Sequence, residues 1–418
     1  MRILVAGTTY YPAINGQASF TVNLAEGLAR RGHEVLVITQ SNQGRPYRQE
    51  QNGVQIQAIR AISLNIWYPG AYFSPFPGRP VQQVFNEFQP DIVHIQDHYP
   101  LSYYVFKLAH QHNLRVIGTN HFMPENLAPY LLSFAWFKTG FNWALWRWML
   151  DLFNRLDVVT APSKTAAAIL RHQGLQPPVY PVSCGVDLNR FYPDGGADRK
   201  ALRQRFGLDP DSVVFLFVGR VDAEKRVDVL LRALKILGRQ DIQLAITGHG
   251  AALGGVKKLA QELNIERHVR FTGFVPQEDL HALLNSVDVF TMPSEAELLS
   301  IATLEAMASS LPVLAANAQA LPELVDEGRN GYLFQPGNPG DAARLMALLA
   351  GQKNGWEKMR CASLEKVQPH SLENTLKRYE EIYENILIGA PKPHFHSGST
   401  WGRPVKKYIK KTMVDLWE

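Results

Sequence analysis

The stretch VDVFTMPSEAELLSIATLEAMASSLPVLAA, residues 287–316, decides the fold class. It opens on a β-branched run that indicates a buried strand, and it continues through a polar loop into a helical segment at Ile301–Ser309. A second apolar run, Pro312–Ala315, follows. A strand, a helix and a strand in this order indicate a βαβ unit with parallel strands. Glu297 lies in the loop and Glu305 eight positions on, within the helix.

The same alternation of apolar runs and amphipathic segments fills the chain in two series. The first predicts strands at Arg2–Ala6, Glu34–Thr39, Asp91–Ile95, Arg115–Thr119 and Asp157–Ala161. The second predicts strands at Ser212–Val218, Gln243–Thr247, Val269–Thr272, Val287–Met292 and Pro312–Ala315. Helices are expected at Ala18–Arg30, Ala223–Gly238 and Ser371–Leu387. Each series predicts a doubly wound α/β sheet, which binds ligands at the carboxyl ends of its strands.

The length of 418 residues predicts two substantial domains. The polar segment Asp187–Asp209 reads as the linker between them. We therefore expect an N-terminal domain over residues 1–190 and a C-terminal domain over 191–370. A C-terminal helix over 371–390, crossing back to the first domain, and a basic aromatic tail over 391–418 complete the prediction.

Composition and charge restrict the classes of function. Hydrophobic residues make up 46% of the chain and charged residues 19%, an ordinary globular balance. Six basic and two acidic residues in 391–418 supply +4 of the net charge of +5, so the remainder is nearly neutral, which argues against nucleic-acid binding. Cys184 and Cys361 match neither a disulfide framework nor a zinc site, which favours a reducing, cytoplasmic setting. The sequence predicts no signal peptide and no transmembrane helix.

The two glutamates suit a sugar-nucleotide site. A loop carboxylate such as Glu297 can accept hydrogen bonds from sugar hydroxyls, and the adjacent helix N-terminus offers free N–H groups to a phosphate. Glu305, two turns into the helix, is placed to bind a ribose diol. Two glutamates taken alone are more often merely solvated.

The surrounding residues resemble the Glu-x7-Glu region of family 4 retaining glycosyltransferases. The matching residues are Pro293, Ser294, Glu297, Glu305–Ala308, Pro312 and Val313. This family has the GT-B fold, in which two Rossmann-like domains face each other across a cleft. Leu298, Leu299 and Ser300 replace the family's Gly-Phe-Gly, which leaves the donor sugar open.

A basic element precedes the glutamates. Gly219-Arg220 ends one predicted strand and Lys225 follows, so two cations can neutralise the diphosphate that departs in the transition state. The alternative interpretation is that Arg220 and Lys225 are ordinary basic residues at the start of a helix. The spacing resembles the family's Gly-Arg…Lys element, although Arg226 stands where glycine is usual.

Further loops resemble parts of the family's donor site. Gly248 and His249 resemble its Gly-x-Gly loop, and Val275 belongs to the turn whose backbone contacts the base. Gly16 resembles the glycine of the first-strand loop, which approaches the donor diphosphate. That loop lacks G-x-G-x-x-G, which argues against a standard NAD site.

Histidines follow two strands of the first series. The resemblance implies that His121 faces the sugar, although a lone loop histidine is more often structural. His94, within a predicted strand, is expected to be structural, and His98 is a weaker site candidate.

The resemblance implies retaining hexosyl transfer from a nucleoside-diphosphate sugar, without a metal or other cofactor, with His121, Glu297, Arg220 and Lys225 as the catalytic group. Aromatic segments at Ser63–Pro80 and Leu127–Phe153, with the basic tail, favour an anionic membrane surface and a lipid acceptor, loosely resembling diacylglycerol glycosyltransferases. The alternatives are an aromatic helix pair packed in its own domain, a soluble sugar or polysaccharide acceptor, a GT-B-fold epimerase and a non-catalytic sensor.

Overall fold

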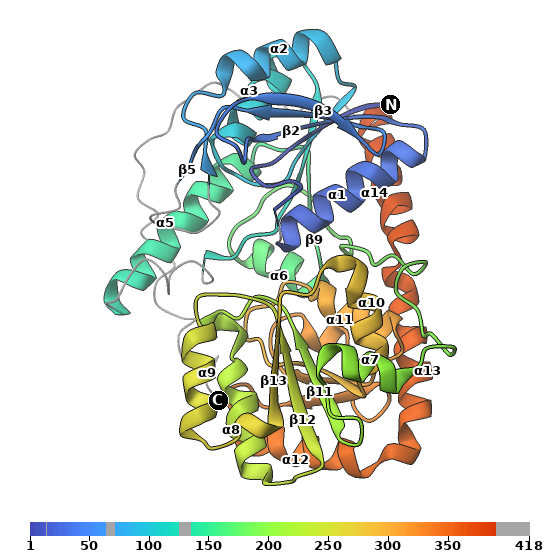
Figure 1. Cartoon of the computed structure of the whole chain (residues 1–418). Coiled ribbons are helices and arrows are strands. Elements are labelled where there is room, and N and C mark those ends of the chain that lie inside the picture. The colour runs from blue at the N-terminus through green and yellow to red at the C-terminus, as the bar shows by residue number, and fades with distance from the viewer. Residues whose placement is uncertain (14, 64–71, 125–134, 390–418) are drawn as a thin grey trace. The chain divides into compact units, whose positions relative to one another are not determined.

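The computed structural model describes residues 1–13, 15–63, 72–124 and 135–389, with the backbone alone at 135–139. The tail 391–418 and parts of the two aromatic segments lie outside these ranges. The described chain forms two α/β halves, each built around one large sheet (Figure 1).

In the described ranges the first sheet has eight strands in the order β10-β9-β8-β7-β1-β2-β4-β3. Neighbours pair in parallel except β3 and β4, which form an antiparallel edge. The strands are β1 (Arg2–Ala6), β2 (Glu34–Gln40), β3 (Tyr47–Gln51), β4 (Val54–Ile59), β7 (Ile92–Ile95), β8 (Arg115–Thr119), β9 (Val158–Ala161) and β10 (Val179–Pro181). The other elements are α1 (Gly16–Arg30), α2 (Gly78–Phe88), α3 (Pro100–Gln111), α5 (Ala135–Phe153), α6 (Lys164–His172) and the small pair β5 (Ile62–Ser63) and β6 (Tyr72–Phe73).

The second sheet lies in a stretch that is described throughout, and its six parallel strands have the order β13-β12-β11-β14-β15-β16. The strands are β11 (Val213–Val218), β12 (Ile242–Thr247), β13 (Val269–Gly273), β14 (Val289–Met292), β15 (Val313–Ala316) and β16 (Gly331–Phe334). The helices are α7 (Arg199–Phe206), α8 (Val227–Leu237), α9 (Leu253–Glu262), α10 (Gln277–Ser286), α11 (Ile301–Ala308), α12 (Pro339–Gly351), α13 (Trp356–Val367) and α14 (Leu372–Ile388).

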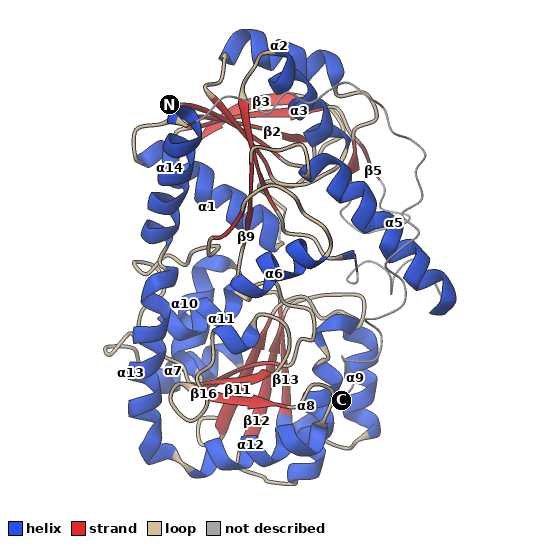
Figure 2. Cartoon of the chain, turned by 180° about the vertical axis from the view of Figure 1, so that it is seen from behind, coloured by secondary structure: helices blue, strands red, loops and turns tan. Residues whose placement is uncertain are grey.

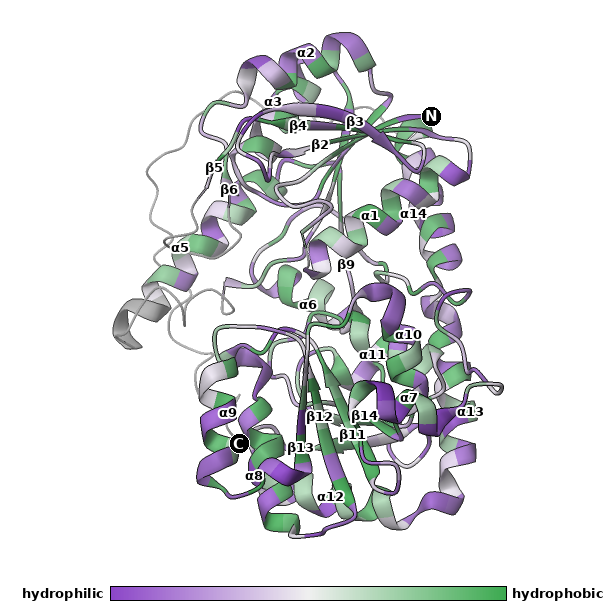
Figure 3. Ribbon diagram, in the orientation of Figure 1, coloured by the Kyte–Doolittle hydropathy of each residue, from purple (hydrophilic) through white to green (hydrophobic). Residues whose placement is uncertain are grey.

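Helices cover both faces of each sheet, which explains why its central strands are apolar throughout (Figures 2 and 3). Successive side chains of β1 point to opposite faces. Ile3 and Val5 therefore join the apolar cluster that contains α1, whereas Leu4 and Ala6 join the cluster formed with α2 and α3. All four are fully buried.

Helix α14 packs against the first half although it follows the second in sequence. Tyr383 Oη lies 2.8 Å from His94 Nδ1, and His94 Nε2 lies 2.6 Å from Thr119 Oγ1. Tyr379 Oη lies 3.0 Å from Thr160 Oγ1 in the same buried network. These bonds tie α14 to three strands of the first sheet.

Three features differ from the sequence-based expectations. The predicted helix from Ala223 is interrupted, because a single 3-10 turn at Ala223–Lys225 ends at Arg226, whose φ is +49°, and α8 starts only at Val227. The predicted linker contains α7, whose start is capped by the side chain of Asp198. Strands β3, β4, β5, β6, β10 and β16 are additional. The polar sequence YRQEQ of β3 gives no apolar signal because this strand lies at the edge of the sheet.

The direction of chain winding reverses once in each sheet. In the first sheet the reversal lies between β1 and β7, and in the second it lies between β11 and β14. Loops separate at such a point and leave a crevice at the carboxyl ends of the two strands, which is where doubly wound sheets bind ligands. No helix in the described part of the chain is both long and apolar enough to cross a bilayer.

Candidate active site

An ion pair joins the two loops at the reversal point of the second sheet. Lys225, in the loop after β11, places its Nζ 2.6 Å from Oε1 of Glu297, in the loop after β14. The two side chains are only 17% and 10% exposed. Both were predicted to be catalytic from positions 72 residues apart in the chain, and the fold brings them together.

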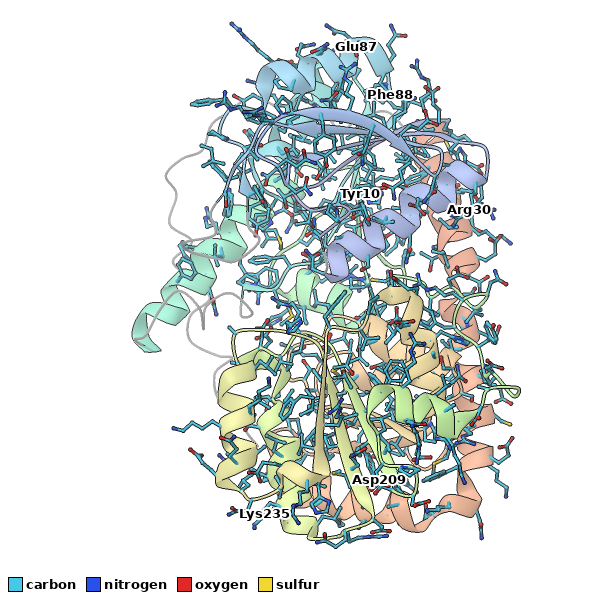
Figure 4. The ribbon with its side chains drawn as sticks, in the orientation of Figure 1. Tyr10, Arg30, Glu87, Phe88, Asp209 and Lys235 are labelled. Atoms are coloured by element: carbon cyan, nitrogen blue, oxygen red, sulfur yellow. The ribbon has the colours of Figure 1, made fainter. Side chains whose placement is uncertain are left out.

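Arg220 directly follows Gly219 at the end of β11. Its guanidinium contacts Asp222 at 2.9 Å and Glu224 at 3.2 Å, and its side chain is 44% exposed. Two carboxylates therefore hold the guanidinium at the carboxyl edge of the sheet, on a side chain that is itself partly exposed. Asp209 and Lys235 lie at the opposite end of this half, where β11 begins and α8 ends (Figure 4).

Arg226 forms a second link between the same loops. Its Nη1 lies 2.5 Å from Glu295 Oε1, and its Nε lies 3.1 Å from Asp228 Oδ1. The left-handed backbone at Arg226 is the conformation that favours glycine, which accounts for the glycine usual at this position. Here two ion pairs offset the backbone strain.

The three residues that replace Gly-Phe-Gly pack into the protein. Leu298 and Leu299 are buried in apolar clusters. Ser300 is the N-cap of α11, and its Oγ accepts a hydrogen bond from the N–H of Thr303. The capped helix start lies three residues after Glu297, so backbone donors and a carboxylate share this loop.

Glu305 lies within α11 and is buried. Burial raises the pKa of this carboxyl to about 7, and the positive charge of Arg190 opposes part of the rise. The side chain is therefore partly protonated at neutral pH. A carboxyl group with this pKa in a ligand crevice is a candidate for a functional group.

Loops after β12 and β13 adjoin the same edge. Gly248 has a φ of +128°, and a Cβ there would lie 1.9 Å from the carbonyl oxygen of Gly219, so loop packing itself requires glycine. The rings of His249 and Phe274 lie nearly parallel, with centroids 6.4 Å apart. Val275 follows and is half-buried.

The predicted first-half residues occupy the edge formed by β1, β7 and β8. Gly16 opens α1 after the N-cap Asn15, and a Cβ at Gly16 would meet no described atom within 4 Å. Packing against the described residues therefore gives no reason for glycine there. His121 Nε2 lies 3.0 Å from Gln96 Oε1, and burial lowers the pKa of His121 to about 3, which keeps the ring neutral.

Family models match both halves of the chain. A model described as Glycosyltransferase Family 4 matches residues 14–190, and one described as Glycosyl transferases group 1 matches residues 198–362. The chain is a family 4 glycosyltransferase.

Known proteins agree with this assignment. A GDP-mannose-dependent alpha-mannosyltransferase of Corynebacterium glutamicum is 29% identical over 80% of this chain and 76% of its own. An alpha-monoglucosyldiacylglycerol synthase of Streptococcus pneumoniae is 24% identical over 100% of this chain and 92% of its own. The crystal structure of Anabaena HepE in complex with UDP matches with a TM-score of 0.74 at 18% identity, covering 92% of this chain and 100% of that one. The fold is GT-B, as the sequence predicted.

One residue of this glycosyltransferase that sequence reasoning missed is Asp97, after β7. Its Oδ2 accepts hydrogen bonds from the N–H of Thr8 at 2.6 Å and from Gln17 Nε2 at 3.1 Å, while its Oδ1 accepts one from Ser102 Oγ at 2.6 Å. Asp97 thereby fixes the loops on both sides of the first reversal point. The signal in the sequence that could have identified Asp97 is an acidic residue shortly after the predicted strand Asp91–Ile95. Within the described ranges no three His, Cys, Asp or Glu side chains are grouped as metal ligands.

Proposed function

We propose that this protein transfers a hexosyl group from a nucleoside-diphosphate sugar to an acceptor hydroxyl, with retention of configuration and without a metal. The Lys225–Glu297 ion pair at the second reversal point carries the proposal. The pair brings a cation and a carboxylate to the edge where doubly wound sheets bind their ligands, and in this proposal the carboxylate binds the sugar. The relatives support a nucleotide-sugar donor, since one is a GDP-mannose-dependent mannosyltransferase and HepE was solved with UDP-glucose.

In this proposal the cations act on the leaving group. The diphosphate gains negative charge as the glycosidic bond breaks, and fixed positive charges stabilise it most in the transition state. Lys225 has three N–H donors and uses one on Glu297, which leaves two for phosphate oxygens. Arg220 adds its positive charge, and the N-terminus of α11 adds backbone N–H groups.

The remaining groups bind the rest of the donor. Glu297 accepts hydrogen bonds from sugar hydroxyls, and Glu305 binds the ribose diol. His249 and Val275 lie on the nucleotide side of the site. His121, as a neutral imidazole, faces the sugar from the first half, and Gly16 leaves space for the diphosphate.

We further propose a membrane lipid such as diacylglycerol as the acceptor, bound at the cytosolic leaflet. One relative that matches along the whole chain is an alpha-monoglucosyldiacylglycerol synthase. Trp143 and Trp148 on α5 have exposed side chains, which suits the interface of a bilayer. The basic tail adds attraction to anionic lipids.

Product analysis tests the whole proposal. The full chain is incubated with labelled UDP-glucose or GDP-mannose, with and without dioleoylglycerol vesicles, and with or without EDTA. We expect a glycolipid with the α configuration by NMR, at an unchanged rate in EDTA. Label that enters only a soluble sugar identifies a soluble acceptor, and a converted donor with no acceptor product identifies an epimerase. Binding without turnover identifies a sensor.

A further inference from the structure

A cluster of aromatic side chains surrounds His98, which follows β7 at the first reversal point. The side chain is buried, with 2% of the residue exposed. Its ring lies 4.7 Å from that of Tyr99, 5.1 Å from that of Phe122 and 4.6 Å from that of Trp148, measured between centroids. Trp148 is 45% exposed, so the aromatic wall extends from the buried imidazole to the surface.

Neither ring nitrogen of His98 has a hydrogen-bond partner among the described residues. Buried polar atoms are nearly always paired, because an unpaired one costs about 1–3 kcal/mol. His94, four residues earlier, shows the ordinary case, since Tyr383 and Thr119 occupy both of its nitrogens. Among the described residues the imidazole of His98 therefore lacks the partners that His94 has, and it lies at the edge where doubly wound sheets bind ligands.

The neighbouring carboxylate of Asp97 already has hydrogen-bond partners. The carboxylate of Asp97 accepts hydrogen bonds from Thr8, Gln17 and Ser102. Burial lowers the pKa of His98 to about 4, and the adjacent negative charge of Asp97 only partly opposes this. The ring is thus neutral at pH 7, with one donor nitrogen and one acceptor nitrogen. A hydroxyl, which both donates and accepts, can pair with either nitrogen, whereas a phosphate needs donors alone.

We propose that His98 determines acceptor specificity by hydrogen bonding an acceptor hydroxyl while Tyr99, Phe122 and Trp148 pack on the apolar part of the same molecule. The inference rests on the proposed glycosyl transfer and adds the chemistry of the acceptor, an uncharged hydroxyl next to an apolar surface. A diacylglycerol and the apolar face of a sugar ring both have this chemistry.

The test uses His98→Phe, which keeps an aromatic ring and removes both nitrogens. Two probes, dioctanoylglycerol in detergent micelles and octyl glucoside, serve as acceptors with UDP-glucose or GDP-mannose, and hydrolysis of the donor without acceptor is measured separately. We expect the KM for the acceptor to rise at least tenfold, while nucleotide affinity and donor hydrolysis stay within twofold. Because the substitution removes unsatisfied polar atoms, Tm should not fall. The control His110→Phe changes an exposed histidine of α3 and should leave all values unchanged.

The outcomes separate the inference from the proposed function. A defect with the lipid probe or with the sugar probe supports the role of His98 and identifies the source of the hydroxyl. An unchanged acceptor KM with both probes overturns it, as does an equal loss of donor hydrolysis. A wild-type protein that hydrolyses the donor yet glycosylates neither probe also overturns the acceptor chemistry. A protein that neither binds nor hydrolyses any nucleotide sugar refutes the proposed function instead.

Discussion

Lys225 Nζ lies 2.6 Å from Glu297 Oε1, so a cation from the loop after β11 meets a carboxylate from the loop after β14. A buried ion pair is costly to form unless its geometry is good, and it is much more costly to break by removing one partner. Its position at the edge of the sheet, rather than in the core, is what a binding site requires. The pair holds the two loops in one arrangement before a ligand arrives.

Replacing Glu297 tests this site most directly. Glu297→Ala should lower turnover on the order of 100-fold, because a lost charged hydrogen bond at a reacting centre costs a few kcal/mol. Glu295→Ala is the matched control, since Glu295 lies in the same loop and pairs with Arg226. Steady-state kinetics and circular dichroism of both variants provide the comparison. Equal activity of the two variants would remove Glu297 from the donor site.

Arg220→Ala and Lys225→Ala should each weaken nucleoside diphosphate binding about tenfold or more and also slow transfer. The diphosphate is present in both the ground state and the transition state, so affinity and rate fall together. Calorimetry with UDP or GDP measures the first effect. Arg239→Ala, which breaks an exposed pair with Asp241, is the control and should change neither. A strict requirement for magnesium would show that a metal handles the diphosphate charge.

The carboxyl of Glu305 predicts a pH dependence of donor binding. A ribose diol donates hydrogen bonds to an ionised carboxylate, and the pKa in the free protein is about 7. Binding of the donor should therefore weaken as pH falls below 7, by up to about tenfold per unit. UDP-glucose is a suitable ligand because its diphosphate does not titrate in this range. Glu305→Gln should flatten the profile, and an unaltered slope in that variant would rule Glu305 out.

The same pKa predicts an effect on the stability of the free protein. Glu305 has a higher pKa folded than unfolded, so its contribution to the free energy of unfolding is lost as pH rises from about 4.5 to about 7. Glu305→Gln should reduce this loss. Urea unfolding of both proteins at pH 5.5 and pH 8 measures the difference, and parallel pH trends would contradict the assignment.

Tyr383→Phe should destabilise the protein by about 1–3 kcal/mol, since it leaves His94 Nδ1 buried without its partner. Urea unfolding measures this cost. Tyr332→Phe removes a hydroxyl with a long, exposed contact to Gln352 and is the control. Equal stability of the two variants would show that the buried network does not stabilise α14.

Membrane attachment is tested by flotation with anionic vesicles. Each basic residue near such a surface is worth about 1 kcal/mol, and salt screens it. We expect binding that weakens at high salt and after deletion of 391–418. The pair Lys410→Gln and Lys411→Gln should weaken binding, whereas Lys257→Gln and Lys258→Gln, two exposed lysines of α9, should not. A full chain that stays unbound at low salt would favour a soluble acceptor.

The sequence pattern was sufficient to predict a strand where both faces of that strand are buried. Runs such as Val213–Val218 are apolar because helices cover them, so the two sheets followed from the sequence. The polar edge strand β3 gave no such signal. The break in the helix at Arg226 gave no signal either. The left-handed backbone of a residue other than glycine cannot be recognised from the sequence.

The position of the candidate site could be predicted from the sequence better than the contacts between its side chains. Parallel strands share one carboxyl edge, so the loops of Lys225 and Glu297 were expected to meet there. The pairing of their side chains and the orphaned nitrogens of His98 depend on tertiary packing, which no local pattern encodes. Asp97 was missed because a single acid after a strand is usually solvated.

The packing of α14 on the first sheet affects how the protein is made. Leu376 of α14 sits against Gly27 of α1, where a Cβ would lie 2.5 Å from its Cδ1, so this helix completes the first half. The ribosome synthesises that half roughly 10–40 s before Leu372, at about 5–20 residues per second. During that interval His94 and its neighbours lack their tyrosine partners. The first half to be synthesised therefore stays incomplete until the last helix of the described chain has been made.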